Sequence, residues 1–334
     1  MVRWRGEGVT EVLEAIAQRV PLEAGGNGKS GSRIERVTLA DGRRFVVKHV
    51  SPAWDWIMRG THDSGRIATL ASSGLLSRVP AAIEHGVVAV EPEGDGWAVI
   101  MRDLGASLVR DGERLSRARS RQVLAAAAAL HNSFRDEPPL ELCPLADRYA
   151  FLSPITAARE RGGPDPVPAL IGQGWQRFAE LAPADVSTAV DALHQRPESL
   201  AAALARRPMT LIQGDLKLGN LGFLDDQVVM LDWGTQTGWA PAAVEWAWYL
   251  AINASRVDAT REEVLDDARA VAGGHHDEVA LRLALLGGLA QLGWDKALQA
   301  TEDPDPERRA WEAGDLAWWC DQARLTLDHT WSPL

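Results

Sequence analysis

Short apolar runs, separated by turn residues, occupy much of the first hundred positions of the chain. They predict an antiparallel sheet with strands at 33–39, 44–50, 81–90 and 96–101. The Asp41-Gly42 dipeptide between the first two runs is a strong signal for a hairpin turn. Ahead of the sheet, residues 9–20 place apolar side chains at helical spacing and end at Pro21, so we expect a helix there.

Apolar positions in the rest of the chain recur mostly with the period of a helix. The expected helices cover 113–135, 241–250, 261–272, 277–292 and 306–327, with a proline-punctuated helical region at 138–208. Two short apolar runs, 209–212 and 228–231, interrupt this pattern and predict buried strands. A hairpin between them would bring the residues that follow each run to one end of a small sheet. The pattern therefore predicts an α+β protein with a mainly helical C-terminal part.

Residues suited to phosphoryl transfer follow these two buried runs. Asp215 and Asn220 stand five positions apart after the first run, and Asp232 opens an Asp-Trp-Gly sequence after the second. In the kinase template with this spacing, one carboxylate accepts the proton of the attacking hydroxyl. An amide oxygen and a second carboxylate suit Mg²⁺, which prefers oxygen ligands and bridges nucleotide phosphates. We therefore expect Asp215 to be the catalytic base, and Asn220 and Asp232 to bind magnesium.

This stretch resembles the aminoglycoside phosphotransferase and choline kinase family, the small-molecule branch of the protein-kinase-like fold. That family usually carries His-Gly-Asp-x-x-x-x-Asn, whereas this chain has Gln213 in place of the histidine, which is thought to brace the loop. The resemblance implies a two-lobed fold, with a small lobe at 1–102 and a large, mainly helical lobe at 103–334. It also implies a kinase that uses ATP or GTP with Mg²⁺ and transfers the γ-phosphate to a hydroxyl of a small molecule.

A glycine-rich stretch precedes the first predicted hairpin and contains the pattern G-x-G-x-x-G. A dinucleotide-binding motif would open a helix, but a strand follows here, and a Walker A loop would need a glycine where Glu23 stands. A loop that covers nucleotide phosphates fits best, because glycines let backbone N–H groups approach phosphate oxygens; a flexible surface loop is the alternative. The expected nucleotide-binding residues are Gly26, Gly28, Ser30 and Gly31.

The resemblance also implies roles for residues outside the catalytic stretch. Lys48, on the second strand of the hairpin, matches the family lysine that holds the α- and β-phosphates. The family pairs this lysine with a glutamate on the next helix, but here only Asp63 or Asp55 could take that place. The hinge that binds the nucleotide base is expected at Met101, Arg102 and Asp103.

Two further positions carry competing interpretations. Glu245 stands where the family has an aspartate that steadies the catalytic loop, and an exposed helix acid is the alternative. His131, at the end of the long helix 113–135, is expected to be structural rather than catalytic.

Composition narrows the function classes further. The chain of 334 residues has a net charge of −11, which argues against nucleic acid, whose binding depends on basic contacts to phosphates. Acidic charge and abundant tryptophan favour an aminoglycoside or amino-sugar acceptor, with Asp315 or Asp321 as candidates to receive an amine. Two distant cysteines lead us to expect a cytoplasmic protein, and the lack of a long apolar stretch leads us to expect no membrane partner. We further expect a monomer or a homodimer.

A non-catalytic nucleotide-binding pseudokinase is the alternative function. Its grounds are Gln213 and the missing glutamate partner of Lys48. A protein kinase is disfavoured, because the short path from Asp-Trp-Gly to the helix at 241–250 leaves no room for a peptide-binding activation segment.

Overall fold

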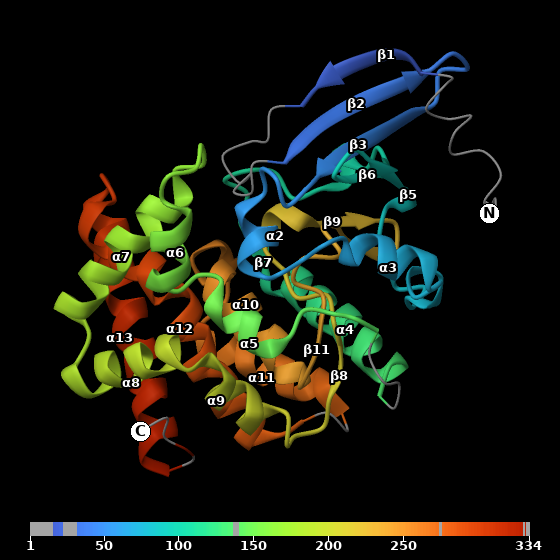
Figure 1. The fold of residues 1–334 in the computed structure, drawn as a ribbon. Helices are drawn as coiled ribbons and strands as arrows, with labels where there is room; N and C mark the ends of the chain where they lie inside the picture. The colour runs from blue at the N-terminus through green and yellow to red at the C-terminus, as the bar shows by residue number, and fades with distance from the viewer. Residues whose placement is uncertain (1–15, 23–31, 136–139, 274–275, 330, 332–334) are drawn as a thin grey trace.

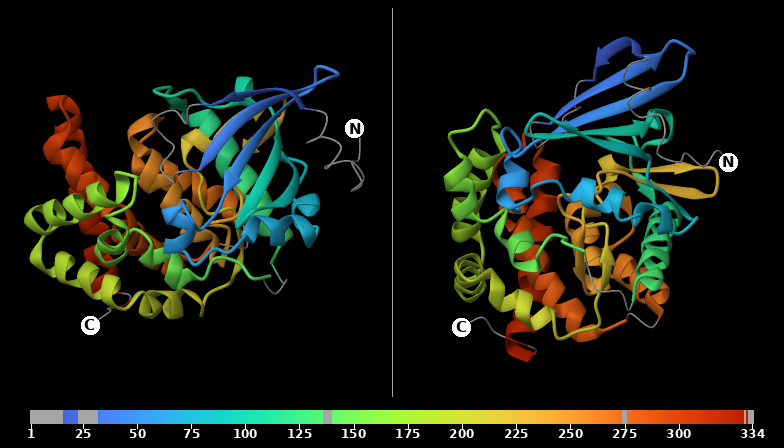
Figure 2. Two further views of the ribbon diagram at one scale, coloured as in Figure 1. Left: turned by 45° about the horizontal axis from the view of Figure 1, so that its top comes forward. Right: turned by 45° about the vertical axis from the view of Figure 1, so that its right-hand side comes forward.

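A computed structural model describes residues 16–22, 32–135, 140–273, 276–329 and 331. A twisted antiparallel sheet from the N-terminal part lies at one end of the molecule, and helices make up most of the rest (Figure 1; Figure 2). The α+β, protein-kinase-like class predicted from the sequence is thereby confirmed.

The five-stranded N-terminal sheet has the strand order β1-β2-β3-β6-β5. Its strands are β1 (Ile16–Pro21), β2 (Arg33–Leu39), β3 (Arg44–Val50), β5 (Val87–Glu93) and β6 (Gly96–Arg102). The predicted hairpin joins β2 to β3, and Gly42 takes the positive φ of +83° that this turn requires. The sheet packs its apolar face around Val37, Val47 and Ile100, which are buried.

The helix predicted at 9–20 is wrong for its C-terminal half, and residues 9–15 lie outside the described part. Residues 16–21 form β1, the edge strand of the sheet, which pairs antiparallel with β2. This segment is short and mostly exposed, so the helical spacing of its apolar residues stabilises a helix less than hydrogen bonds to β2 stabilise a strand.

The strand predicted at 81–90 is divided in two. Gly86 adopts a positive φ of +73°, which breaks the chain direction between β4 (Ile83–Glu84) and β5. β4 pairs in parallel with β10 (Gln227–Met230), far along the chain, while β5 stays in the N-terminal sheet. The break thus ties the N-terminal part to the strands near the predicted site residues.

Two short helices, α2 (Trp56–Gly60) and α3 (Arg66–Ser72), connect β3 to the following 3₁₀ turn η1 (Leu76–Arg78). They pack against the helical part: Arg59 of α2 forms an ion pair with Glu160 at 2.7 Å, and Arg66 donates to the Thr235 carbonyl at 3.0 Å. This segment therefore bridges the sheet and the helices.

The remaining helices follow the predicted order, and most of them have shifted ends. They are α4 (Arg117–Ser133), α5 (Leu145–Ala150), α6 (Pro154–Glu160), α7 (Val167–Leu181), α8 (Ala184–Gln195), α9 (Pro197–Leu204), α10 (Ala242–Asn253), α11 (Arg261–Ala272), α12 (Glu278–Glu302) and α13 (Pro306–His329). Short connecting elements are η2 (Gly105–Ser107), β7 (Leu115–Ser116), η4 (Ala254–Arg256) and β12 (Val257–Asp258). Among the described residues, no helix combines the length and apolarity needed to cross a bilayer.

The two buried strands predicted at 209–212 and 228–231 form, but the predicted hairpin between them does not. β8 (Thr210–Ile212) pairs with β11 (Gly238–Ala240), and β10 pairs with β9 (Leu221–Leu224) across a turn at Asp225-Asp226. β9 follows β8 through the 3₁₀ turn η3 (Leu218–Asn220). Each strand therefore pairs with a strand other than the expected one, and the loops after β8 and β10 still meet.

Candidate active site

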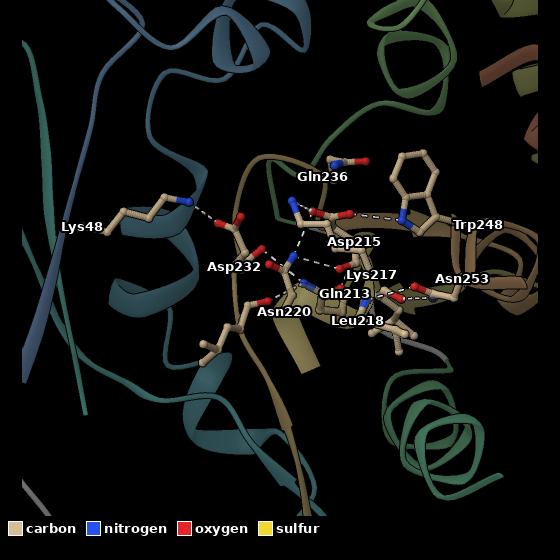
Figure 3. Close-up of polar contacts among 12 residues, drawn as sticks. Lys48, Gln213, Asp215, Lys217, Leu218, Asn220, Asp232, Gln236, Trp248 and Asn253 are labelled. Atoms are coloured by element: carbon tan, nitrogen blue, oxygen red, sulfur yellow. Dashed lines mark hydrogen bonds and ion pairs between the residues drawn. The ribbon is translucent and has the colours of Figure 1, made fainter. Parts of the chain in front are cut away.

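Asp215 lies in the loop between β8 and η3, with only 6% of its surface exposed. Its Oδ2 accepts a hydrogen bond from Asn220 Nδ2 at 2.9 Å and lies 3.3 Å from Lys217 Nζ. Its Oδ1 accepts a hydrogen bond from the indole N–H of Trp248, on α10, at 3.1 Å (Figure 3). The loop thus holds a carboxylate fixed by three donors.

Asn220 is oriented so that its amide oxygen stays available. Its Nδ2 donates to both the backbone oxygen of Asp215, at 3.0 Å, and the side chain of the same residue. Because the amide nitrogen is used within the loop, Oδ1 is the atom of Asn220 that can ligate a cation.

Asp232 follows β10 in a left-handed backbone conformation with φ of +62°. Aspartate tolerates this region better than most residues, and such conformations are frequent at functional sites. Its carboxylate forms an ion pair with Lys48 Nζ (Figure 3). Burial alone would raise the pKa of Asp232, but the charges of Lys48 and Lys217 hold it below its ordinary value.

Lys217 stands between the two carboxylates. The negative charge of Asp215 is the largest cause that raises the pKa of Lys217; burial opposes it and Asp232 adds to it. A permanent cation therefore lies beside the expected base and near the expected metal ligand. The residue occupies a variable position of the Asp-x-x-x-x-Asn spacing, so its charge was visible in the sequence although its role was not predicted.

Gln213 braces the two loops against each other. Its Nε2 donates to the carbonyls of Leu231, at 2.8 Å, and Asp232, at 3.2 Å, while its Oε1 accepts the N–H of Asp215 at 2.7 Å. The glutamine thus connects the expected base to the expected metal ligand, which is the bracing that the missing histidine was expected to supply.

Glu245 supports the same loop from behind. The side chain is completely buried on α10, accepts the N–H of Gly214 at 2.7 Å and contacts His131 Nε2 at 2.7 Å. The alternative of an exposed helix acid is therefore wrong. His131 is itself fully buried, in keeping with the structural interpretation.

Lys48 forms an ion pair that was not expected, although its charge also acts on Asp55, one of the two expected partners. Its ion pair is with Asp232, whereas Asp63 accepts backbone N–H groups of Gly65 and Arg66, both at 2.7 Å, at the start of α3. Asp63 as the partner is therefore wrong. Asp55 caps α2 instead; burial raises its pKa, and the nearby charge of Lys48 opposes that shift. Both helices are short, and they use these acids to satisfy their first N–H groups.

The predicted hinge lies where β6 ends. Arg102 forms an ion pair with Glu84, and its N–H donates to the Gly86 carbonyl at 2.8 Å. Asp103 accepts from Arg36 Nε at 2.8 Å, and Met101 pairs within the sheet. The Arg102 and Asp103 side chains are held in ion pairs, so a role of these two residues in nucleotide binding would fall to main-chain groups. Gly26, Gly28, Ser30 and Gly31 lie outside the described residues.

Two contributors to the loop were not predicted. Trp248 and Asn253 both come from α10, more than thirty residues after Asp215, and no local pattern links them to it. Asn253 accepts the Leu218 N–H at 2.9 Å and donates to the Leu216 carbonyl at 2.7 Å. α10 thus holds the catalytic loop along its length.

Asp315 cannot serve as a carboxylate for an acceptor amine. It is completely buried between helices, in ion pairs with Lys296 and Arg261. The other candidate, Asp321, is exposed on α13.

Comparison with known families agrees with this geometry. The family model described as "Phosphotransferase enzyme family" (APH) matches residues 23–283. The chain belongs to this family. It is accordingly a small-molecule kinase. A search of curated proteins returned no match.

Solved structures of similar fold are only distantly related in sequence. A thermostable mutant of aminoglycoside phosphotransferase APH(4)-Ia, in apo form, is 14% identical with a TM-score of 0.50, covering 93% of this chain and 96% of that one. An aminoglycoside phosphotransferase from Alicyclobacillus acidocaldarius is 17% identical with a TM-score of 0.45, covering 98% of each chain. A putative fructosamine-3-kinase from Thermobifida fusca is 18% identical with a TM-score of 0.46, covering 94% and 98%. At these identities the APH(4)-Ia likeness supports the fold alone.

Proposed function

We propose that this kinase transfers the γ-phosphate of ATP or GTP to a hydroxyl of a small molecule, with Asp215 as the general base. The observation that carries the proposal is the convergence of Asp215, Asn220 and Asp232 from two loops that Gln213 connects. General-base assistance of this kind is worth roughly 10²–10⁴-fold in rate. We place the enzyme in the cytoplasm and its lobes at 1–102 and 103–334.

The donor set suits Mg²⁺. The free amide oxygen of Asn220 and the carboxylate of Asp232 are hard oxygen ligands, and they are the residues that would hold the ion. Bound there, magnesium would bridge phosphate oxygens and neutralise their charge. Lys48 would exchange its contact with Asp232 for the nucleotide phosphates, and Lys217 would place a second cation beside the transferred group.

An aminoglycoside or amino sugar is the acceptor class that we favour. The net charge of −11 supports a cationic acceptor, and several solved structures of similar fold are described as aminoglycoside phosphotransferases. The similar macrolide phosphotransferase and fructosamine kinase structures recommend testing macrolides and other sugars beside them.

The test combines an acceptor screen with two variants. Wild-type protein is incubated with Mg-ATP or Mg-GTP and a panel of aminoglycosides, amino sugars, neutral sugars, choline-like alcohols and macrolides. Asp215→Ala is expected to abolish turnover but keep nucleotide binding, whereas Asp232→Ala is expected to weaken Mg-nucleotide binding as well. Wild-type turnover in Asp215→Ala would refute the assignment of the base. Nucleotide binding without turnover on any acceptor would support the pseudokinase alternative.

A further inference from the structure

The two oxygens of the Asp215 carboxylate are unequally occupied. A carboxylate oxygen can accept about two hydrogen bonds. Among the described residues, Oδ2 receives both Asn220 Nδ2 and Lys217 Nζ, at 2.9 and 3.3 Å. Oδ1 receives the Trp248 indole alone, at 3.1 Å. One acceptor position therefore remains open, and it belongs to the oxygen that Trp248 contacts.

The chemistry of the donors reinforces this difference. An ammonium and an amide nitrogen oppose protonation of Oδ2, since a proton there would have to displace one of them. The indole N–H is a donor only and cannot take a proton from Asp215. It therefore fixes the direction of Oδ1 and leaves the second lone pair of that oxygen for a substrate.

The Trp248 ring is itself held in place. It is 3% exposed, and the Arg148 guanidinium lies 5.0 Å from its ring centroid. Phe151 packs on the ring with centroids 6.4 Å apart. Arg148, on α5, is anchored by Gln236 Oε1 at 3.3 Å. The position of Oδ1 is thus set by a buried assembly that joins α5 and α10 to the catalytic loop.

We propose that Oδ1 of Asp215 is the atom that takes the proton of the acceptor hydroxyl, and that Trp248 is the positioning residue that aims this oxygen. The inference rests on the proposed function and adds the direction of attack: the acceptor hydroxyl lies on the Trp248 side of the carboxylate, away from Lys217. In the step, the acceptor O–H proton moves to Oδ1 while the acceptor oxygen forms a bond to the γ-phosphorus. The bond from that phosphorus to the β–γ bridging oxygen breaks, and the nucleoside diphosphate leaves with the electron pair.

The first test compares Trp248→Phe with a matched control, Trp294→Phe. Trp294, on α12, is 4% exposed and its indole N–H has no partner among the described residues. Both changes remove an indole N–H from a buried ring, but only the first removes a contact with Asp215. Trp248→Phe is expected to lower kcat about 10- to 100-fold, the usual worth of a hydrogen bond to a charged group. KM for Mg-ATP should stay within about twofold, because the nucleotide ligands are untouched.

Trp294→Phe is expected to change neither constant by more than about twofold, and thermal unfolding of both variants would show whether they remain folded. Full kcat in Trp248→Phe, or an equal loss in the control, would overturn the role of Trp248. A wild-type enzyme without turnover would instead overturn the proposed function and this role with it.

A second measurement needs no acceptor, and it uses Trp248→Phe only to assign a signal. In ¹H–¹⁵N spectra of the indole N–H groups, Asp215→Ala should shift one signal strongly, since the carboxylate partner of Trp248 is lost, and leave the signal of Trp294 in place. The signal absent from Trp248→Phe identifies the residue. An unchanged Trp248 signal would refute the contact itself.

Discussion

The brace formed by Glu245 behind the catalytic loop gives the most direct test of how this site is held together. We consider Glu245→Ala, with Glu245→Gln as the conservative variant. The carboxylate is completely buried, accepts the Gly214 N–H and contacts His131 Nε2, each at 2.7 Å. Alanine removes both contacts at once and leaves a small cavity beneath the loop that carries Asp215.

The expected cost follows from those contacts. Removing one member of a buried, hydrogen-bonded polar pair typically costs about 3–5 kcal/mol. Leaving the buried Gly214 N–H without an acceptor accounts for about 1–3 kcal/mol of that. Glutamine retains an oxygen for Gly214, so Glu245→Gln should cost about 1–2 kcal/mol, the value of one altered hydrogen bond. Because the loop loses its anchor, kcat should fall in the same order, alanine more than glutamine.

The measurement is urea unfolding followed by circular dichroism and tryptophan fluorescence, with steady-state kinetics under conditions where each variant is folded. Glu180→Ala is the control, since its side chain is 62% exposed in a surface pair with Arg177 and should cost no more than about 0.5–1 kcal/mol. A loss below about 1 kcal/mol for Glu245→Ala would refute the brace. Lost stability with an unchanged kcat would show that Glu245 serves the core and not the catalytic loop.

Three other predictions follow from the same structure. Gly214 has φ of +93°, and an added Cβ would overlap the Gln236 carbonyl. Gly214→Ala should therefore displace Asp215 and lower kcat at least about tenfold. Wild-type kinetics in this variant would contradict the prediction. Burial raises the pKa of Glu312 to about 7 in the folded protein, whereas the unfolded chain loses this proton near pH 4.5. The free energy of unfolding therefore falls as the pH rises from 4.5 to 7. Glu312→Gln should then be more stable than wild type by on the order of 3 kcal/mol at pH 8 and equal at pH 4, and equality at both values would refute the assignment. Burial lowers the pKa of His194 to about 4, so stability present above pH 6.5 is lost as the pH falls towards 4. In urea unfolding at a series of pH values, His194→Gln should lose less of its free energy of unfolding between pH 6.5 and pH 4 than wild type does. The same pH dependence in both proteins would exclude His194 as the source of the acid-induced loss.

Patterns that depend on neighbouring residues gave reliable predictions. The β2–β3 hairpin follows from Asp41-Gly42 between two apolar runs, and α11 begins and ends where its periodicity predicts, at 261 and 272. The loops that carry Asp215, Asn220 and Asp232 come together as their spacing predicted, and the chemistry assigned to these residues stays a prediction. Each of these signals lies within a few residues of the structure that it specifies, so local propensity and motif chemistry sufficed.

Pairing over long distances could not be obtained in the same way. The apolar runs around β8 and β10 were correctly predicted as strands, but a short apolar run does not encode its partner, and each paired with a strand other than the one expected. The contact of Lys48 with Asp232 joins residues 184 positions apart. Asp63 looked suitable by distance along the chain, yet the start of α3 required its oxygen for backbone N–H groups.

The sequence by itself determined which atoms are present for the proposed catalysis: two carboxylates, an amide and two lysines, with turn residues that place them in loops after short strands. Only the tertiary structure decided how those atoms are aimed. The indole donor that orients Asp215 comes from α10, and the glutamine that joins the two loops acts through backbone groups that carry no sequence signature. Orientation depends on hydrogen bonds between distant segments, and these exist only after the helices have packed.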